Sequence, residues 1–264
     1  MKINSLRLLL TLFFICSAVF FAFAQTSAKT NPYTVGETLM YDGKFNISII
    51  RGISVADLTF TVLKAPNSKN YLVKADAVSK GSLIKLFGVK FLQHIESTID
   101  AEKLTVLKTV KHDEQSERVR DSEATFDYAQ KTVTYVETDP KDMTRPPRKI
   151  ASAMTDETYD LLSGVYILRH LPLAVGKTFE INVSDSGLVY KVPVRVSARE
   201  QQSTILGKLW CFRLEPQVFG EGQMIPQKGS MTIWITDDNR RIPIRSVINT
   251  TRGKIDIKLR KISY

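Results

Sequence analysis

The sequence has few of the residues that form disulfides and metal sites. It contains two cysteines and three histidines among 264 residues. Cys16 lies in the apolar stretch at the amino terminus, and removal of that stretch would leave Cys211 without a partner for an intramolecular disulfide. His94, His112 and His170 are scattered, and no two of them have the spacing of zinc ligands. We therefore expect no disulfide, no metal site and no cofactor.

The sequence also lacks a long apolar run beyond its amino terminus. Residues 1–24 begin with a short basic stretch, continue with an apolar run from Leu8 to Phe23 and end in Ala-Phe-Ala. This pattern is typical of a cleaved secretory signal peptide. An uncleaved anchor is the alternative, because about 16 apolar residues fall just short of the roughly 20 that span a bilayer. We expect an exported protein, periplasmic or extracellular, with a linker at 25–34 and no transmembrane segment after cleavage.

Acidic residues are in the minority. The chain has 37 Lys and Arg against 27 Asp and Glu, which gives a net charge of +10. A basic surplus of this size favours anionic partners. Export would separate the protein from cytoplasmic nucleic acid, so we expect no nucleic-acid partner. The partners that fit are a lipid, an anionic polymer of the cell envelope or an envelope protein, and an ordinary solvated surface is the alternative.

Alternation of apolar and polar residues is the dominant pattern from residue 35 onward. Between residues 191 and 196, for example, three valines alternate with Lys191, Pro193 and Arg195. A period of two indicates a strand with one buried face. The pattern predicts strands at 44–49, 57–62, 71–78, 90–99, 104–111, 118–128, 132–137, 179–183, 189–197, 208–215, 230–236, 241–249 and 254–262. Residues 35–264 are therefore expected to form a single mainly β domain.

One segment has the period of a helix. It covers about residues 156–170 and begins with Asp156 and Glu157, which suit the positive end of a helix dipole. Its many apolar residues need a surface to pack against, and a sheet is the surface that this chain offers. We predict a mainly β fold, built as a curved antiparallel sheet or incomplete β-barrel with one principal helix.

Prolines mark two further features. Three of them fall within residues 139–154, which we expect to form an exposed connection. Pro193 has no backbone N–H to donate, so its strand is expected to lie at a sheet edge or to have this position away from a neighbouring strand.

Three separated segments carry a resemblance to a known family. They are Val-Gly-Glu-Thr-Leu-Met-Tyr at 35–41, Asp-Leu-Leu-Ser-Gly-Val-Tyr-Ile-Leu-Arg at 160–169, and Trp-Ile-Thr-Asp-Asp with Arg-Arg-Ile-Pro at 234–243. In this order they resemble the exported bacterial family called domain of unknown function 3108. The resemblance implies an exported, mainly β protein of one domain. It carries no established activity, so no catalytic residue follows from it.

Two residues of the predicted helix are candidates for binding a ligand. Arg169 falls on or near the apolar face that includes Tyr166. A guanidinium at the edge of an apolar face can pair with a phosphate or carboxylate of a ligand. An internal partner such as Asp160 or Asp237, or a solvated helix end, is the alternative interpretation of Arg169.

Trp234 is the third candidate. It lies in a predicted strand on the face opposite Met231, Ile233 and Ile235. If those three face the core, the helix covers the indole, or the indole lines a concave surface where a lipid chain or sugar ring can stack.

No set of residues forms a catalytic constellation. Ser163 lacks the preceding glycine of a nucleophile elbow, and Asp156, Glu157 and Asp160 are explained by capping of the predicted helix. We name no catalytic residue, and the pattern favours a non-enzymatic protein while leaving the question of an enzyme open.

The leading functional hypothesis is a protein that binds a lipid or another envelope component in a concave β-sheet surface. The arrangement would be similar in principle to periplasmic lipoprotein carriers, whose open barrels hold acyl chains. One alternative is a cell-envelope glycan hydrolase, which needs two carboxyl groups about 5 to 9 Å apart across a cleft. The other is a structural interaction protein whose edge strand, near Pro193, pairs with another chain.

Overall fold

The computed structural model describes residues 31–47, 51–82, 85, 88 and 90–264. The predicted signal peptide at 1–24 and the first residues of the predicted linker, 25–30, lie outside the described residues. Within the described ranges, no helix has the length and apolar character that a membrane crossing requires.

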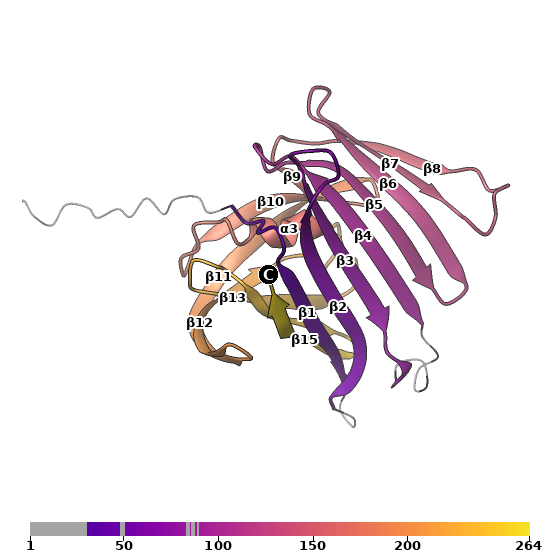
Figure 1. The fold of residues 1–264 in the computed structure, drawn as a ribbon. Coiled ribbons are helices and arrows are strands. Elements are labelled where there is room, and N and C mark those ends of the chain that lie inside the picture. The colour runs from indigo at the N-terminus through magenta and orange to yellow at the C-terminus, as the bar shows by residue number, and fades with distance from the viewer. Residues whose placement is uncertain (1–30, 48–50, 83–84, 86–87, 89) are drawn as a thin grey trace, which may run out of the picture. The chain divides into compact units, whose positions relative to one another are not determined.

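The described residues form fifteen strands in one sheet (Figure 1). Strands β1 to β8 follow one another across the sheet in chain order, β9 to β15 do the same, and pairing of β1 with β15 joins the two series. Neighbouring strands are antiparallel except β9 and β10, which are parallel. The strands are β1 Thr38–Asn46, β2 Ile53–Lys64, β3 Tyr71–Ser79, β4 Phe91–Ile99, β5 Val106–Gln115, β6 Arg118–Asp127, β7 Thr132–Thr138, β8 Arg148–Ala153, β9 Thr158–Asp160, β10 Thr178–Asp185, β11 Leu188–Thr204, β12 Gly207–Pro216, β13 Gly229–Thr236, β14 Pro243–Thr250 and β15 Gly253–Ser263.

The alternating pattern is the physical reason for this sheet. In β11, Val192, Val194 and Val196 are buried, while Lys191 and Arg195 between and beside them are exposed. Successive side chains of a strand point to opposite faces, so one face enters the core and the other meets solvent. The predicted fold class is confirmed, since the chain is a mainly β, curved and unclosed sheet with one principal helix.

Helix α3, Leu161–Ile167, packs on the concave face between the two series of strands (Figure 1). It contacts β3 and β4 of the first series and β9 and β10 of the second. Leu162 and Tyr166 belong to the apolar cluster of the first series, whereas Ile167 belongs to that of the second. The helix therefore contributes to both cores, and Tyr159 of β9 also packs against both.

The two ends of the sheet approach each other without pairing. The turn between β10 and β11 holds Gly187, and a Cβ on that glycine would lie 2.8 Å from the Cβ atoms of both Tyr135 and Ile150. The Ser152 hydroxyl of β8 donates a hydrogen bond of 2.6 Å to the carbonyl oxygen of Gly187. A side chain has no room here, and the positive φ of +85° also favours glycine.

The predicted helix at 156–170 is wrong at its start. The helix begins at Leu161, and Asp160 is the N-cap, because its carboxylate accepts a hydrogen bond from the backbone N–H of Ser163. Thr158–Asp160 pairs with β10 as strand β9 instead. Asp156 and Glu157 therefore precede the helix and do not cap it.

Two further predictions are corrected by the sheet. Residues 148–153 of the predicted connection form edge strand β8. Of the two alternatives for Pro193, the edge strand is wrong, because β11 lies between β10 and β12, and the position away from a neighbouring strand is the one observed on the side of β12. The carbonyl oxygen of Pro193 accepts a 2.9 Å hydrogen bond from the backbone N–H of Gln217, just beyond the end of β12 at Pro216. The missing donor of Pro193 thus falls where the ladder with β12 has already ended.

Candidate ligand-binding site

A cavity of about 180 Å³ lies between the concave face of the sheet and helix α3. Strands β1, β2, β13, β14 and β15 form its walls, together with α3 and the residues just after it. Apolar side chains such as Phe60, Ile233 and Ile257 make up most of the lining. An engineered apolar cavity of about 150 Å³ binds benzene, so this space suffices for a ring or a short stretch of aliphatic chain.

Arg169 lies at the wall of this cavity and is held by Glu37. Its side chain is 5% exposed and that of Glu37 is 1% exposed. The two Nη atoms donate to the two carboxylate oxygens at 2.5 and 2.9 Å, and one Nη also donates to the backbone oxygen of Arg240 at 2.9 Å. Burial lowers the pKa of Arg169, but the hydrogen bonds and charge of Glu37 outweigh it and hold the pKa above its ordinary value. The guanidinium is therefore a paired cation.

The partner of Arg169 differs from both internal partners that the sequence suggested. Asp160 caps the helix and accepts hydrogen bonds from the hydroxyls of Ser97 and Thr109. Asp237 forms ion pairs with other arginines of the second strand series. The helix end is also not solvated, because Arg169 is buried.

Tyr166 lies beside Arg169 in the same wall. It is 2% exposed, and the Arg169 guanidinium carbon lies 5.4 Å from its ring centroid. Its hydroxyl has no hydrogen-bond partner among the described residues. Burial, and then the nearby Glu37 carboxylate, raise the pKa of the Tyr166 phenol well above its ordinary value. The hydroxyl consequently keeps its proton and remains a donor.

The three segments that carry the family resemblance meet at this wall. Glu37 comes from the first, Tyr166 and Arg169 come from the second, and the third supplies the Arg240 carbonyl oxygen. The third also supplies Pro243, whose carbonyl oxygen accepts a 2.8 Å hydrogen bond from the Tyr41 hydroxyl. Segments more than a hundred residues apart are thus bonded together at one side of the cavity.

Arg245 of β14 is a second arginine that borders the cavity. Its side chain lies on the opposite face of the sheet, because Arg245 pairs with Trp234 and its guanidinium carbon is 5.1 Å from that ring. Its Nε and one Nη donate there to the two carboxylate oxygens of Asp256, each at 2.8 Å. Arg169 is therefore the arginine that matters for the charge of the cavity wall, and Glu37 neutralises it.

Trp234 does not line the cavity. It lies on the face of β13 opposite Ile233, where it is 9% exposed and packs in a cluster that includes Cys211. Its indole N–H donates to the Glu200 carboxylate at 2.6 Å, and the Arg245 guanidinium carbon lies 5.1 Å from the ring. The structure thus brings Tyr166 and Arg169 together and leaves Trp234 apart from them.

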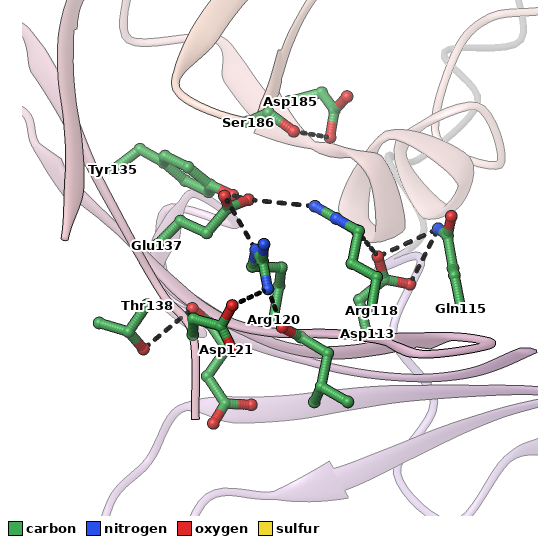
Figure 2. Close-up of polar contacts among 12 residues, drawn as sticks. Asp113, Gln115, Arg118, Arg120, Asp121, Tyr135, Glu137, Thr138, Asp185 and Ser186 are labelled. Carbon is green, nitrogen blue, oxygen red and sulfur yellow. Dashed lines mark hydrogen bonds and ion pairs between the residues drawn. The ribbon is translucent and has the colours of Figure 1, made fainter. Parts of the chain in front are cut away.

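The concave side of β5, β6 and β7 has a different character, since it carries a charged network (Figure 2). Arg118 lies between two carboxylates, as Figure 2 shows. Its contacts are 2.9 Å to Asp113 and 3.6 Å to Glu137. Gln115 donates to Asp113, and the Tyr135 hydroxyl donates to Glu137 at 3.0 Å. Gln115 and Arg118 are exposed, and they supply partners to the buried Asp113 and the half-buried Glu137.

The same network is relevant to hydrolase chemistry. Burial acts to raise the pKa of Asp113, but hydrogen bonds from Gln93 and the charge of Lys111 hold it below its ordinary value. A glycosidase acid needs a raised pKa so that it carries a proton near neutral pH. Asp113 therefore has the properties of a structural carboxylate.

Two histidines that are distant in the sequence lie together. His94 of β4 and His112 of β5 are direct partners in the sheet. Each imidazole hydrogen-bonds to two carboxylates, which are Asp76 and Glu96 for His94 and Glu114 and Asp121 for His112. These bonds raise the pKa of both imidazoles. Among the described residues, no group of three or more His, Cys, Asp or Glu is arranged to hold a metal.

The fold and the cavity define an unclosed antiparallel β-barrel with an apolar space beneath its one principal helix. Comparison with known families then places the chain. Residues 44–260 match the family described as a protein of unknown function (DUF3108), and the chain belongs to this family. The matched range begins after the segment at 35–41 and contains the other two.

The structure is also similar to that of a solved protein. That protein is a β-barrel-like protein of the domain of unknown function DUF1849 from Brucella abortus. The two share 12% identity, and the match covers 88% of this chain and 98% of that chain with a TM-score of 0.61. At this identity the likeness shows the fold alone. No curated protein sequence matches the chain.

Glu37 is the site residue that sequence reasoning missed. Glu37 lies within the first resembling segment, but its partner Arg169 is 132 residues away. A single acidic residue at the start of a strand does not indicate a partner so far away in the sequence.

Proposed function

We propose that this chain is an exported, non-enzymatic protein that binds a small apolar ligand, or the apolar part of a larger one, beneath helix α3. The observation that carries the proposal is the cavity of about 180 Å³ with its nearly continuous apolar lining. Ligand sites are typically concave and mostly apolar, with a few polar groups that fix orientation. Tyr166 and Arg169 are polar groups of that kind at one wall.

The rest of the concave face supports this location. The charged groups over β5 to β7 are already paired with one another, whereas the cavity walls offer apolar surface. Transfer of an apolar ligand from water to such walls is favourable by about 25 cal/mol per Å² of area buried. A ligand therefore gains more beneath α3 than over the charged network.

Binding of n-heptane, followed by NMR of labelled isoleucine methyl groups, tests the proposal. We expect the methyl signals of Ile233, Ile248 and Ile257 to shift on addition of n-heptane, because these residues line the cavity. The signal of Ile205, which is 51% exposed in the turn after β11, should not move. Equal shifts at all sites, or none at the cavity, would contradict the proposal.

A variant whose side chain fills the cavity provides the control, with a matched variant at an exposed position. Ser246 lines the cavity and is the sheet partner of both Ile233 and Ile257. Ser246→Trp should therefore occupy the space and abolish the heptane shifts. Thr125→Trp places the same side chain at an exposed position on β6 and should leave the shifts unchanged.

Export is tested separately. The full chain is expressed in a bacterium, and the mass of the product in the extracytoplasmic fraction is measured. This mass should correspond to a protein that begins at Gln25. An uncut chain in the membrane fraction would instead indicate an anchor.

A further inference from the structure

We infer that the ligand carries an uncharged hydrogen-bond acceptor beside its aliphatic part, such as the carbonyl oxygen of an ester or amide. The inference rests on the proposed function and names the polar group that the same cavity takes. It is argued from two unpartnered donors and from the charge balance of the wall.

The first observation is the pair of buried donors. The Tyr166 hydroxyl and the Arg169 Nε have no hydrogen-bond partner among the described residues. Tyr166 is 2% exposed and Arg169 is 6% exposed, and both residues border the cavity, whose free surface is nearly all apolar. Most buried polar side-chain atoms in proteins are hydrogen-bonded, so two unpartnered donors in one wall need an explanation. An acceptor that a bound ligand brings against this wall would satisfy either donor.

The second observation is the charge of that wall. Glu37 binds Arg169 through both carboxylate oxygens. The guanidinium of Arg245 lies on the opposite face of the sheet beside Trp234, where it is paired with Asp256. Neither arginine therefore leaves a net positive charge at the cavity. A free carboxylate or phosphate would lose its hydration there without gaining an unpaired cation, which is strongly unfavourable. A carbonyl oxygen accepts the same hydrogen bonds without bringing a charge.

Tyr33 provides an internal comparison. Its hydroxyl is also buried and unpartnered, and its ring stacks on that of Tyr166 with centroids 5.3 Å apart. Tyr33 does not line the cavity, however. Tyr33 and Tyr166 thus offer the same substitution at two adjacent rings, only one of which borders the ligand space.

The test compares octanamide with octanoate, which have the same chain and nearly the same shape but differ in charge. At pH 7 we expect octanamide to bind at least about tenfold more tightly, because the carboxylate is buried without an unpaired cation. Titration followed by isoleucine methyl NMR gives both dissociation constants. Equal binding, or tighter binding of octanoate, would overturn the inference.

Variants locate the donor. Tyr166→Phe should weaken octanamide binding about five- to tenfold relative to heptane binding, the equivalent of one hydrogen bond. Tyr33→Phe should change neither. An unchanged octanamide affinity in Tyr166→Phe would remove the hydroxyl from the inferred site and overturn it.

Glu37→Gln provides an independent test of the charge argument. The substitution leaves the Arg169 charge without its carboxylate partner, so the affinity for octanoate should rise relative to the affinity for octanamide. If this variant is folded and the preference does not move, the charge argument is refuted. Should it fail to fold, the wild-type comparison and Tyr166→Phe still decide the inference.

Failure of the inference is distinguishable from failure of the proposed function. Heptane binding without a preference for octanamide would overturn only the inference, whereas no binding of heptane or octanamide would overturn both. Two uncharged probes then separate the sources of such a carbonyl, monooctanoylglycerol for a lipid ester and N-octanoylglycinamide for an acylated peptide. We expect at least one to bind more tightly than octanoate, and weaker binding of both would contradict the inference.

Discussion

Substitution of Glu37 by glutamine tests whether the buried ion pair holds the three segments together. The change keeps the shape of the side chain and removes its charge. Arg169 is then left as a buried cation, since its side chain is only 5% exposed and water cannot replace the lost carboxylate. Removal of one partner from a buried pair costs about 3 to 5 kcal/mol. For a chain of this size that corresponds to a fall in Tm of roughly 6 to 20 °C.

Glu180→Gln is the matched control, because it makes the same chemical change in an exposed pair. Glu180 lies 3.6 Å from Lys191, with side chains 56% and 75% exposed. Exposed pairs contribute about 0 to 1 kcal/mol, so this variant should unfold close to the wild type.

Urea unfolding followed by circular dichroism at pH 7 measures both variants, and the midpoints are compared at equal m values. A loss below about 1 kcal/mol for Glu37→Gln, the level of an exposed pair, would refute the reasoning. The double variant Glu37→Leu with Arg169→Leu removes both charges and should recover most of the loss, because an apolar pair of similar volume often replaces a buried ion pair without penalty.

Three other predictions follow from the fold. Asp160→Ala should lower the free energy of unfolding by at least about 1 to 2 kcal/mol through loss of the N-cap, whereas Asp156→Ala, outside the helix, should stay within about 0.5 kcal/mol in the same urea experiment. Gly187→Ala should lower Tm clearly more than Gly176→Ala, since both have a positive φ but only the first would bring a Cβ within 2.8 Å of other side chains; equal melting temperatures would show that the two ends of the sheet do not meet there. Burial raises the pKa of the Cys211 thiol to about 11, so a thiol reagent at pH 8 should label it only as fast as the protein opens, and immediate labelling of the native protein would contradict its burial.

The strands were predictable because their signal is local. A period of two over five or more residues fixes which side chains face the core, and thirteen of the observed strands lie on predicted ones. Many ends lie beyond the predicted ones, most of all in β11, which continues to Thr204 through a polar sequence, whereas β5 and β14 begin two residues later than predicted. That polar end pairs with β12 and needs no buried face of its own.

The two missed strands had no such signal. Both faces of β8 are exposed or half-buried, since it lies at the sheet edge, and its sequence Arg-Lys-Ile-Ala-Ser-Ala has no apolar alternation. Strand β9 has three residues and exists through its parallel pairing with β10. The helix start was misplaced for a related reason, because Asp156 and Asp160 both suit an N-cap and only tertiary pairing selects the second.

The candidate site was predictable only in part. Tyr166 and Arg169 share a local helical pattern, and this pattern placed them on one apolar face. Their surroundings depend on strands from the opposite end of the chain, as the Tyr41 to Pro243 hydrogen bond across 202 residues illustrates. Trp234 shows the limit of strand alternation, which separates two faces without saying which one the helix covers.

The buried pair of Glu37 and Arg169 has two roles that stability measurements alone do not separate. Burial of an ion pair is weak evidence of stabilisation, because leucines of similar volume can fill the same space. Leucines would, however, remove the unpartnered Nε–H from the cavity wall. The double-leucine variant therefore distinguishes the roles. If it regains stability but loses the preference for octanamide, Arg169 serves the ligand directly. If the preference survives, the Tyr166 hydroxyl is the donor that selects an uncharged acceptor, and the ion pair acts by keeping that tyrosine in place.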